Sequence, residues 1–162
     1  MMKVALVMGS ISDWPVVKDT TDMLTELQID YDKKIISAHR MPQELQDFAQ
    51  SAKDERYSVI IAAAGGAAHL PGMLAANTAI PVIGIPVLTK ALNGVDSLLS
   101  IVQMPAGVPV ATVAVGKAGA KNAAILAAEM IAISDTQTYD RLLAFRAKQS
   151  KEAIESNEQL YQ

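Results

Sequence analysis

Residues 57–89, YSVIIAAAGGAAHLPGMLAANTAIPVIGIPVLT, decide the fold, because they contain no Asp, Glu, Lys or Arg. The runs at 58–63 and 81–85 are short, apolar and rich in Val and Ile, which predicts two buried strands. Residues 69–78 between them have helical character. A strand, a helix and a second strand in this order predict a parallel pair joined by a right-handed crossover.

An uncharged stretch of this length raises the question of a membrane span, which needs about 20 consecutive apolar residues. The stretch is interrupted by glycine, proline and polar residues, namely Gly65, Gly66, His69, Pro71, Gly72, Asn77, Pro81 and Pro86. The pieces between them are too short to cross a bilayer as one helix. We therefore expect buried structure in a soluble protein, with no membrane partner.

The same alternation of strand and helix continues on both sides of this stretch. Strand candidates lie at 3–8, 31–36, 58–63, 81–85 and 110–115, and helix candidates at 14–28, 42–55, 69–78, 94–103 and 118–133. Asp13 can cap the first helix, with Pro15 just inside it. Pro42 stands at the front of the second helix, with Glu44 in its first turn. Five strands separated by helices predict an α/β fold, a three-layer sandwich with a parallel, flavodoxin-like sheet.

Length and composition bound the class of protein. The chain has 162 residues, 51% of them apolar, which predicts a single domain over 1–162. The absence of cysteine excludes disulfides, thiolate metal sites and cysteine nucleophiles. A net charge of -3, with four Tyr, two Phe and one Trp, offers neither the basic field nor the stacking surface that nucleic acid needs. No secretory signal pattern opens the chain, so we expect a cytoplasmic protein.

Two features predict a homo-oligomer. The middle of the chain is nearly chargeless, and one small domain has too little interior to hide all of it. Residues 118–133 are apolar on almost every face, as expected of a helix enclosed by its own sheet and by a neighbouring subunit. Residues 139–157 predict a charged C-terminal helix with a loose apolar stripe, which either lies on its own domain or makes oligomer contacts.

The candidate site lies in the loops that follow the strands, because ligands of open parallel sheets bind outside the carboxyl ends of the strands. Three loops stand out: GSISDW at 9–14, SAHR at 37–40 and AGGAAHLPG at 64–72. Both histidines of the chain lie in them. The loops are therefore the place to look for binding and catalytic side chains.

The first two loops contain groups suited to a phosphate. The first combines a glycine, two hydroxyls and a helix N-terminus, and it is either half of a phosphate cradle or an ordinary capped turn. Asp13 is a poor neighbour for a phosphate, so it caps the helix or accepts hydrogen bonds from a sugar diol. In the second loop, Arg40 can hold two phosphate oxygens and His39 can carry protons near neutral pH. The alternative is a pair of solvated side chains without a chemical role.

The third loop is made almost entirely of small residues. Such a loop can leave backbone N–H groups exposed in a dry pocket, or it can be a tight turn packed against a partner subunit. Metal and cofactor motifs are missing from the sequence: the two histidines have no i,i+4 relation, and there is no acidic triplet, dinucleotide fingerprint or Walker lysine. We expect no metal and no cofactor.

Five motifs in order resemble one family: MGSISDWP, ISAHRMP, AAAGGAAHLPGM, PVLTKALNGVDSLLSIVQMP and VPVATVAVGKAGAKNAA. Together they closely resemble the N5-carboxyaminoimidazole ribonucleotide mutases of de novo purine biosynthesis, over about residues 3–134. The resemblance implies a homo-octamer that needs no metal, biotin or nucleotide. It also implies an isomerase that moves a carboxylate from the exocyclic N5 to C4 of the imidazole.

The resemblance assigns roles to the matching positions. It gives Ser10, Ser12, Ser37 and Arg40 to the phosphate, Asp13 to the ribose hydroxyls and His39 to the proton transfers. It places Ala38, Gly65, Gly66, Ala67, His69 and Leu70 around the substrate, with the glycine loop near the imidazole and the migrating carboxylate.

This sequence departs from the family pattern at two places. Ala63 stands where glycine is common, and Leu88 and Thr89 stand where Gln and Ser are frequent. Two alternative functions remain: direct carboxylation of aminoimidazole ribonucleotide with carbon dioxide, and a non-catalytic nucleotide-binding module of flavodoxin-like fold.

Overall fold

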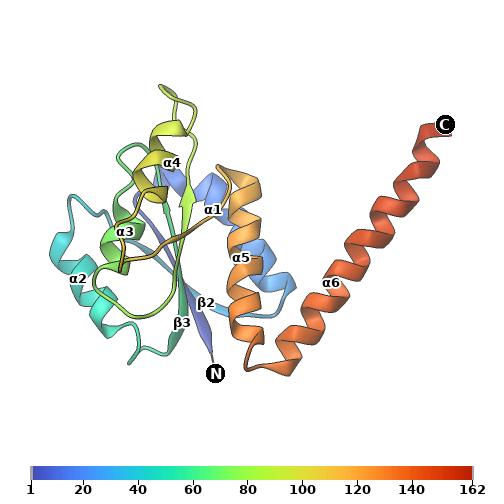
Figure 1. The fold of residues 1–162 in the computed structure, drawn as a ribbon, viewed down its shortest axis with the longest axis horizontal. Helices are drawn as coiled ribbons and strands as arrows, with labels where there is room; N and C mark the ends of the chain where they lie inside the picture. Colours follow the sequence, from blue (N-terminus) through green and yellow to red (C-terminus); the bar gives the residue numbers. More distant parts are fainter. Residues whose placement is uncertain (1, 162) are drawn as a thin grey trace.

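The computed structural model describes residues 2–161, which fold as a parallel five-stranded sheet between two layers of helices (Figure 1). The strands are β1 (Lys3–Met8), β2 (Asp30–Ile35), β3 (Tyr57–Ala64), β4 (Val82–Pro86) and β5 (Ala111–Thr112). The helices are η1 (Ile11–Asp13), α1 (Trp14–Glu26), α2 (Pro42–Ser51), α3 (Leu70–Ala75), α4 (Val95–Val102), α5 (Lys117–Ala132), α6 (Thr136–Glu155) and η2 (Ser156–Tyr161). The strand order is β2-β1-β3-β4-β5, and the predicted flavodoxin-like sandwich is confirmed.

The two cores of the sandwich follow from the alternation of side chains along the strands. In β3, Val59 and Ile61 pack on one face with α1 and α5, whereas Ile60 and Ala62 pack on the other with α2 and α3. Because a strand with both faces covered buries every side chain, its sequence is continuously apolar. This is why an uncharged run could be recognised as the centre of the sheet.

One glycine of the sheet is explained by packing geometry alone. Gly84 in β4 faces α4, and a Cβ there would lie 2.7 Å from Cγ2 of the buried Ile101. The close approach of α4 to the sheet therefore requires glycine at this position.

Most predicted elements agree with the structure to within a few residues, and the exceptions have physical reasons. The strand predicted over 110–115 is only two residues long, Ala111 and Thr112, which pair with Ile83 and Gly84 of β4. The helix predicted over 14–28 ends at Glu26, where Gln28 takes a positive φ of 56°. Pro42 and Glu44 occupy the first turn of α2, as predicted.

Helix α5 is buried on one side only. Its alanines, among them Ala120, Ala124 and Ala127, pack toward the sheet and α1, while Lys117 and Lys121 are exposed. Thr20 of α1 is fully buried, and its hydroxyl donates a hydrogen bond of 2.9 Å to the Ala120 carbonyl.

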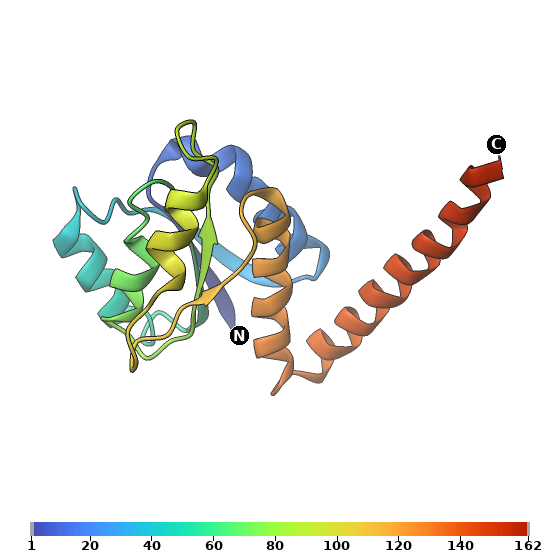
Figure 2. The ribbon, with the colours of Figure 1, turned by 45° about the horizontal axis from the view of Figure 1, so that its top comes forward.

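Helix α6 projects away from the rest of the molecule (Figures 1 and 2). It begins at Thr136, three residues before the predicted start, because the Asp135 side chain accepts the Thr138 backbone N–H and caps it. Leu142 is buried against the body, whereas Ile154 is 67% exposed. None of the helices within residues 2–161 is long and apolar enough to cross a membrane.

Candidate active site

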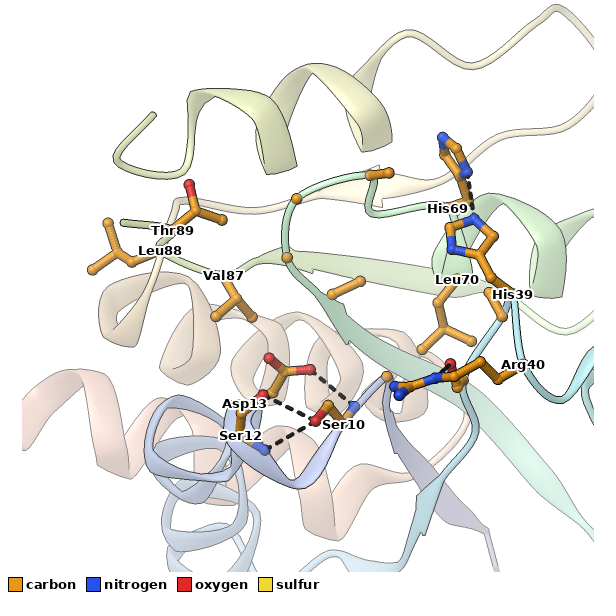
Figure 3. A pocket seen from close by; sticks show the side chains of 17 residues that line it. Ser10, Ser12, Asp13, His39, Arg40, His69, Leu70, Val87, Leu88 and Thr89 are labelled. Atoms are coloured by element: carbon orange, nitrogen blue, oxygen red, sulfur yellow. Dashed lines mark hydrogen bonds between the residues drawn. The ribbon is translucent and has the colours of Figure 1, made fainter. Parts of the chain in front are cut away.

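One cavity of about 630 Å³ opens at the carboxyl ends of β1, β2, β3 and β4 (Figure 3). It is lined by Gly9, Ser10, Ser12, Asp13, Ser37, Ala38, His39, Arg40, Ala64, Gly65, Gly66, Ala67, His69, Leu70, Val87, Leu88 and Thr89. All twelve residues predicted as catalytic or substrate-binding are among them. Parallel strands end at the same edge of a sheet, so loops distant in sequence meet there.

The loop after β1 is a turn of 3-10 helix closed by its own side chains. Ser10 Oγ accepts the backbone N–H of Ser12 at 3.2 Å and the Ser12 hydroxyl at 3.0 Å. The Gly9 N–H donates to the Ala63 carbonyl at 3.1 Å, which ties the loop to β3. The two serine hydroxyls thus lie side by side at the rim of the cavity.

Asp13 stands at the predicted N-cap position of α1, with Pro15 just inside the helix, but its side chain makes no capping hydrogen bond to α1. Its Oδ2 instead turns back to accept the Ser10 backbone N–H at 3.2 Å. Asp13 is buried, with 8% of its surface exposed, and this burial raises the pKa of its carboxyl, while hydrogen bonds from the Ser10 and Gly9 backbone act in the opposite direction. A carboxylate held in this way can accept hydrogen bonds from a ligand.

The loop after β2 supplies the cation of the cavity. Arg40 Nε donates to Ser37 Oγ at 2.9 Å, and Figure 3 shows the guanidinium extending toward Ser10. Among the described residues that line the cavity, Arg40 is the one Lys or Arg. An anion in this cavity would therefore find a fixed positive charge, three hydroxyls and a helical turn within one small region.

The two histidines of the chain meet at one end of the cavity. His39 Nε2 lies 2.8 Å from His69 Nδ1, and the rings are perpendicular at an interplanar angle of 85°. One nitrogen of the pair donates and the other accepts, according to the tautomers. Both side chains are exposed in the single chain. The pair lies at the opposite end of the cavity from Ser12 and Asp13 (Figure 3).

The loop after β4 completes the cavity, and the sequence analysis missed it as part of the site. Val87, Leu88 and Thr89 line the cavity directly. In the sequence, Leu88 and Thr89 stand out only as departures from a family pattern. These residues also follow the carboxyl end of a central strand, where ligands of parallel sheets bind.

Charge at the site is balanced and low. Asp13 and Arg40 carry opposite formal charges, and the remaining lining residues other than the histidines are neutral. Within residues 2–161, no cluster of three or more His, Cys, Asp and Glu side chains could hold a metal ion. The arrangement offers anion binding at one end, two imidazoles at the other, and a small-residue loop between them.

Fold and cavity together define a class: a flavodoxin-like α/β protein with a small-molecule site at the carboxyl edge of its sheet. Residues 3–152 match the family model described as AIR carboxylase. The chain belongs to this family.

Curated relatives are similar over nearly the whole chain. The protein named N5-carboxyaminoimidazole ribonucleotide mutase from Aliivibrio fischeri is 54% identical over 155 residues, 96% of each chain. That of Bacillus subtilis is 53% identical, covering 97% of each, and that of Escherichia coli K12 is 52% identical, covering 95% of this chain and 91% of its own. The crystal structure of Treponema denticola PurE has the same fold, with a TM-score of 0.89 at 24% identity over the full length of both chains.

Proposed function

We propose that this protein is an N5-carboxyaminoimidazole ribonucleotide mutase, an isomerase of purine biosynthesis that produces 4-carboxy-5-aminoimidazole ribonucleotide. Support comes from relatives of that name at more than 50% identity, and from a cavity whose ends suit the two ends of such a substrate. Because the substrate is a charged nucleotide intermediate, we place the activity in the cytoplasm.

The phosphate and sugar are assigned to the end of the cavity formed by the first two loops. The Arg40 guanidinium, oriented by Ser37, binds the phosphate together with the hydroxyls of Ser10 and Ser12. Asp13 accepts hydrogen bonds from the ribose hydroxyls. A phosphate would repel this carboxylate, whereas a diol donates to it, so the two groups of the ligand are placed in order along the cavity.

The reaction needs one bond broken, one bond formed and one proton moved. The bond from N5 to the carboxylate carbon breaks, carbon dioxide leaves, and the electron pair remains on the aminoimidazole, where N5 takes a proton. C4 of this electron-rich ring then attacks the carbon dioxide, and loss of the C4 proton restores aromaticity. No electrons are gained or lost overall, which agrees with the expectation that no cofactor is needed.

The glycine loop serves to hold the carbon dioxide. Gly65, Gly66 and Ala67 line the cavity with small side chains, and Leu70 adds apolar surface. A pocket that excludes water keeps the released gas close to C4 and so favours recapture over escape.

The observation that carries the mechanism is the contact between His39 and His69. An imidazole can take a proton from C4 and deliver one to N5 near neutral pH. His39 performs these transfers. Its hydrogen bond to His69 orients the His39 ring and lets the two imidazoles share the proton between the two transfers.

Isotope retention tests the function. Labelled bicarbonate in the buffer should enter the product slowly compared with turnover when the N5-carboxylated substrate is supplied without ATP. The alternative is a direct carboxylase, because the family is described as AIR carboxylase. It would take its carbon from solution, so product formed only from aminoimidazole ribonucleotide plus bicarbonate would overturn the proposal. A non-catalytic module would form no product from either.

The role of His39 has a test of its own. His39→Asn should lower kcat at least about a hundredfold with little change in nucleotide affinity, the usual scale for losing a general acid or base. Because the side chain is exposed, thermal stability should stay close to wild type. Wild-type turnover in this variant would remove His39 from the mechanism.

We also propose a homo-oligomer, with the eight copies that the family resemblance implies. Helix α4 and the turn before it present an exposed apolar stripe of Leu92, Val95, Leu99 and Val102, each at least 44% exposed. Their spacing of three and four residues is typical of a helix face packed on another helix. Sedimentation should give eight copies, and Leu99→Glu should shift the protein to smaller species. A stable wild-type monomer at micromolar concentration would refute the octamer.

A further inference from the structure

Two loops of the cavity are joined by a buried serine that does not itself line it. Ser97 of α4 is fully buried. Its Oγ donates to the Val87 carbonyl at 2.7 Å and accepts the Gly66 backbone N–H at 2.9 Å. One hydroxyl therefore connects the loop after β4 to the glycine loop after β3. Both Val87 and Gly66 line the cavity.

The carbonyl of the same glycine is held from α4 as well. The Ser100 hydroxyl lies 3.1 Å from the Gly66 carbonyl oxygen and 2.7 Å from the Asp96 carbonyl oxygen, so its single proton is shared between them. Gly66 has a φ of 70°, in the left-handed region. Glycine reaches this region easily because it has no Cβ, and for the same reason it can easily change to other conformations. The backbone N–H and carbonyl of Gly66 are thus both held by serines that lie one turn apart on α4.

The fixed glycine begins the turn that carries His69. The Gly66 carbonyl also accepts the Ala68 N–H at 2.8 Å, and the Ala67 carbonyl accepts the His69 N–H at 2.9 Å. His69 in turn places its Nδ1 2.8 Å from His39 Nε2. Ser97 and Ser100 of α4 therefore hold Gly66, and hydrogen bonds within residues 66–69 fix the turn from Gly66 to His69.

We propose that Ser97 is a positioning residue for the reaction, which sets the glycine loop and through it the place of His69, with Ser100 in support. This inference rests on the proposed function. Without the Ser97 hydroxyl, the Gly66 N–H and the Val87 carbonyl lose their partner, and the turn gains freedom to leave the geometry that brings His69 to His39. These hydrogen bonds of Ser97 and Ser100 to Gly66 and Val87, which we call the clamp, involve no described residue of the phosphate end of the cavity.

Ser97→Ala tests the proposal, with Thr20→Val as the matched control. Thr20 is also fully buried and its hydroxyl also donates to a carbonyl, but it lies between α1 and α5. Both variants should lose some thermal stability. Only Ser97→Ala should lower kcat, about tenfold or more, with binding of the nucleotide product changed less than about twofold. Equal kcat in the two variants would overturn the proposal.

A second readout does not depend on activity. The chain has two histidines, so a spectrum of histidine-labelled protein contains two imidazoles. Ser97→Ala should shift the signals of His69 and His39, whereas Thr20→Val should leave them in place. If wild type lacks mutase activity but these shifts appear, the proposed function fails while the clamp stands. Unchanged imidazole signals in Ser97→Ala would refute the clamp.

A double-mutant cycle separates positioning from general damage. If Ser97 acts through His69, Ser97→Ala should lower kcat less than about twofold further in a His69→Asn background, because the coupled contact is already lost. Fully multiplicative effects would contradict the proposal. If Ser97→Ala does not fold, Ser100→Ala provides a second test, because Ser100 is a half-buried partner of the same glycine. It should give a smaller change in kcat and in the imidazole signals. Wild-type values of both would refute the clamp.

Discussion

Arg40→Ala should weaken the binding of phosphorylated ligands far more than that of their dephosphorylated counterparts. Arg40 is the one Lys or Arg among the described cavity residues, so its removal leaves the Asp13 carboxylate as the formal charge of the site. Hydrogen bonds to a charged group contribute about 1.5–3 kcal/mol, which corresponds to about a 10- to 150-fold change in Kd. Because Arg40 is exposed in the single chain, solvent screening places the expected loss toward the lower end.

Calorimetric titration of the nucleotide and of the matching nucleoside is the appropriate assay. Arg40→Lys should fall between wild type and Arg40→Ala, because it keeps the charge but loses the planar fork and the Nε hydrogen bond to Ser37. Higher salt should weaken nucleotide binding to wild type more than to Arg40→Ala. If Arg40→Ala weakened nucleoside and nucleotide equally, the assignment of Arg40 to the phosphate would be refuted.

The remaining predictions concern stability. Burial raises the pKa of Asp13, so its ionisation opposes folding as pH rises through the folded pKa. Asp13→Asn should therefore raise Tm at neutral pH. In acid, where Asp13 is protonated, the variant and wild type should have similar Tm. Hydrogen bonds from Lys3 and Tyr57 lower the pKa of Asp32. Ionised Asp32 therefore stabilises the fold at neutral pH, and this stabilisation is lost as pH falls through the folded pKa. In the same Tm series, Asp32→Asn should lower Tm at neutral pH and have little effect in acid. Gly84→Ala should cost about 1–3 kcal/mol in urea unfolding, because its Cβ would meet a buried isoleucine at 2.7 Å. Gly72→Ala meets only the flexible end of a methionine and should stay within about 0.5 kcal/mol, so equal losses would contradict the packing argument.

The central strands β1, β3 and β4 could be predicted from the sequence because burial on both faces leaves a continuous apolar run. In β3 the successive residues Ile60 and Ile61 enter different cores, and because both are apolar the strand could be predicted without knowledge of its neighbours. The first three site loops followed directly, since the ends of parallel strands share one edge. The length of β5 could not be predicted in this way, because it is set by pairing with β4 over two residues, a contact between segments distant in sequence.

The residues of the candidate site were readable in the sequence, but their contacts were not. Asp13 was correctly placed beside the cavity, yet its side chain turns to Ser10 rather than to α1, a choice between two nearby N–H donors that only the local backbone geometry decides. The loop at Val87–Thr89 was overlooked because it carries no charge and no imidazole.

Sequence by itself determined the α/β class, the loops at the carboxyl edge and the side chains able to bind a phosphate or move a proton, since these depend on local pattern and residue chemistry. The strand order, the pairing of His39 with His69 and the attachment of Gly66 to Ser97 were decided only in the tertiary structure. These pairs are separated by 30 and 31 residues along the chain, and no local periodicity encodes a contact over such a distance. They form because packing on the sheet brings the loop ends together within hydrogen-bond reach.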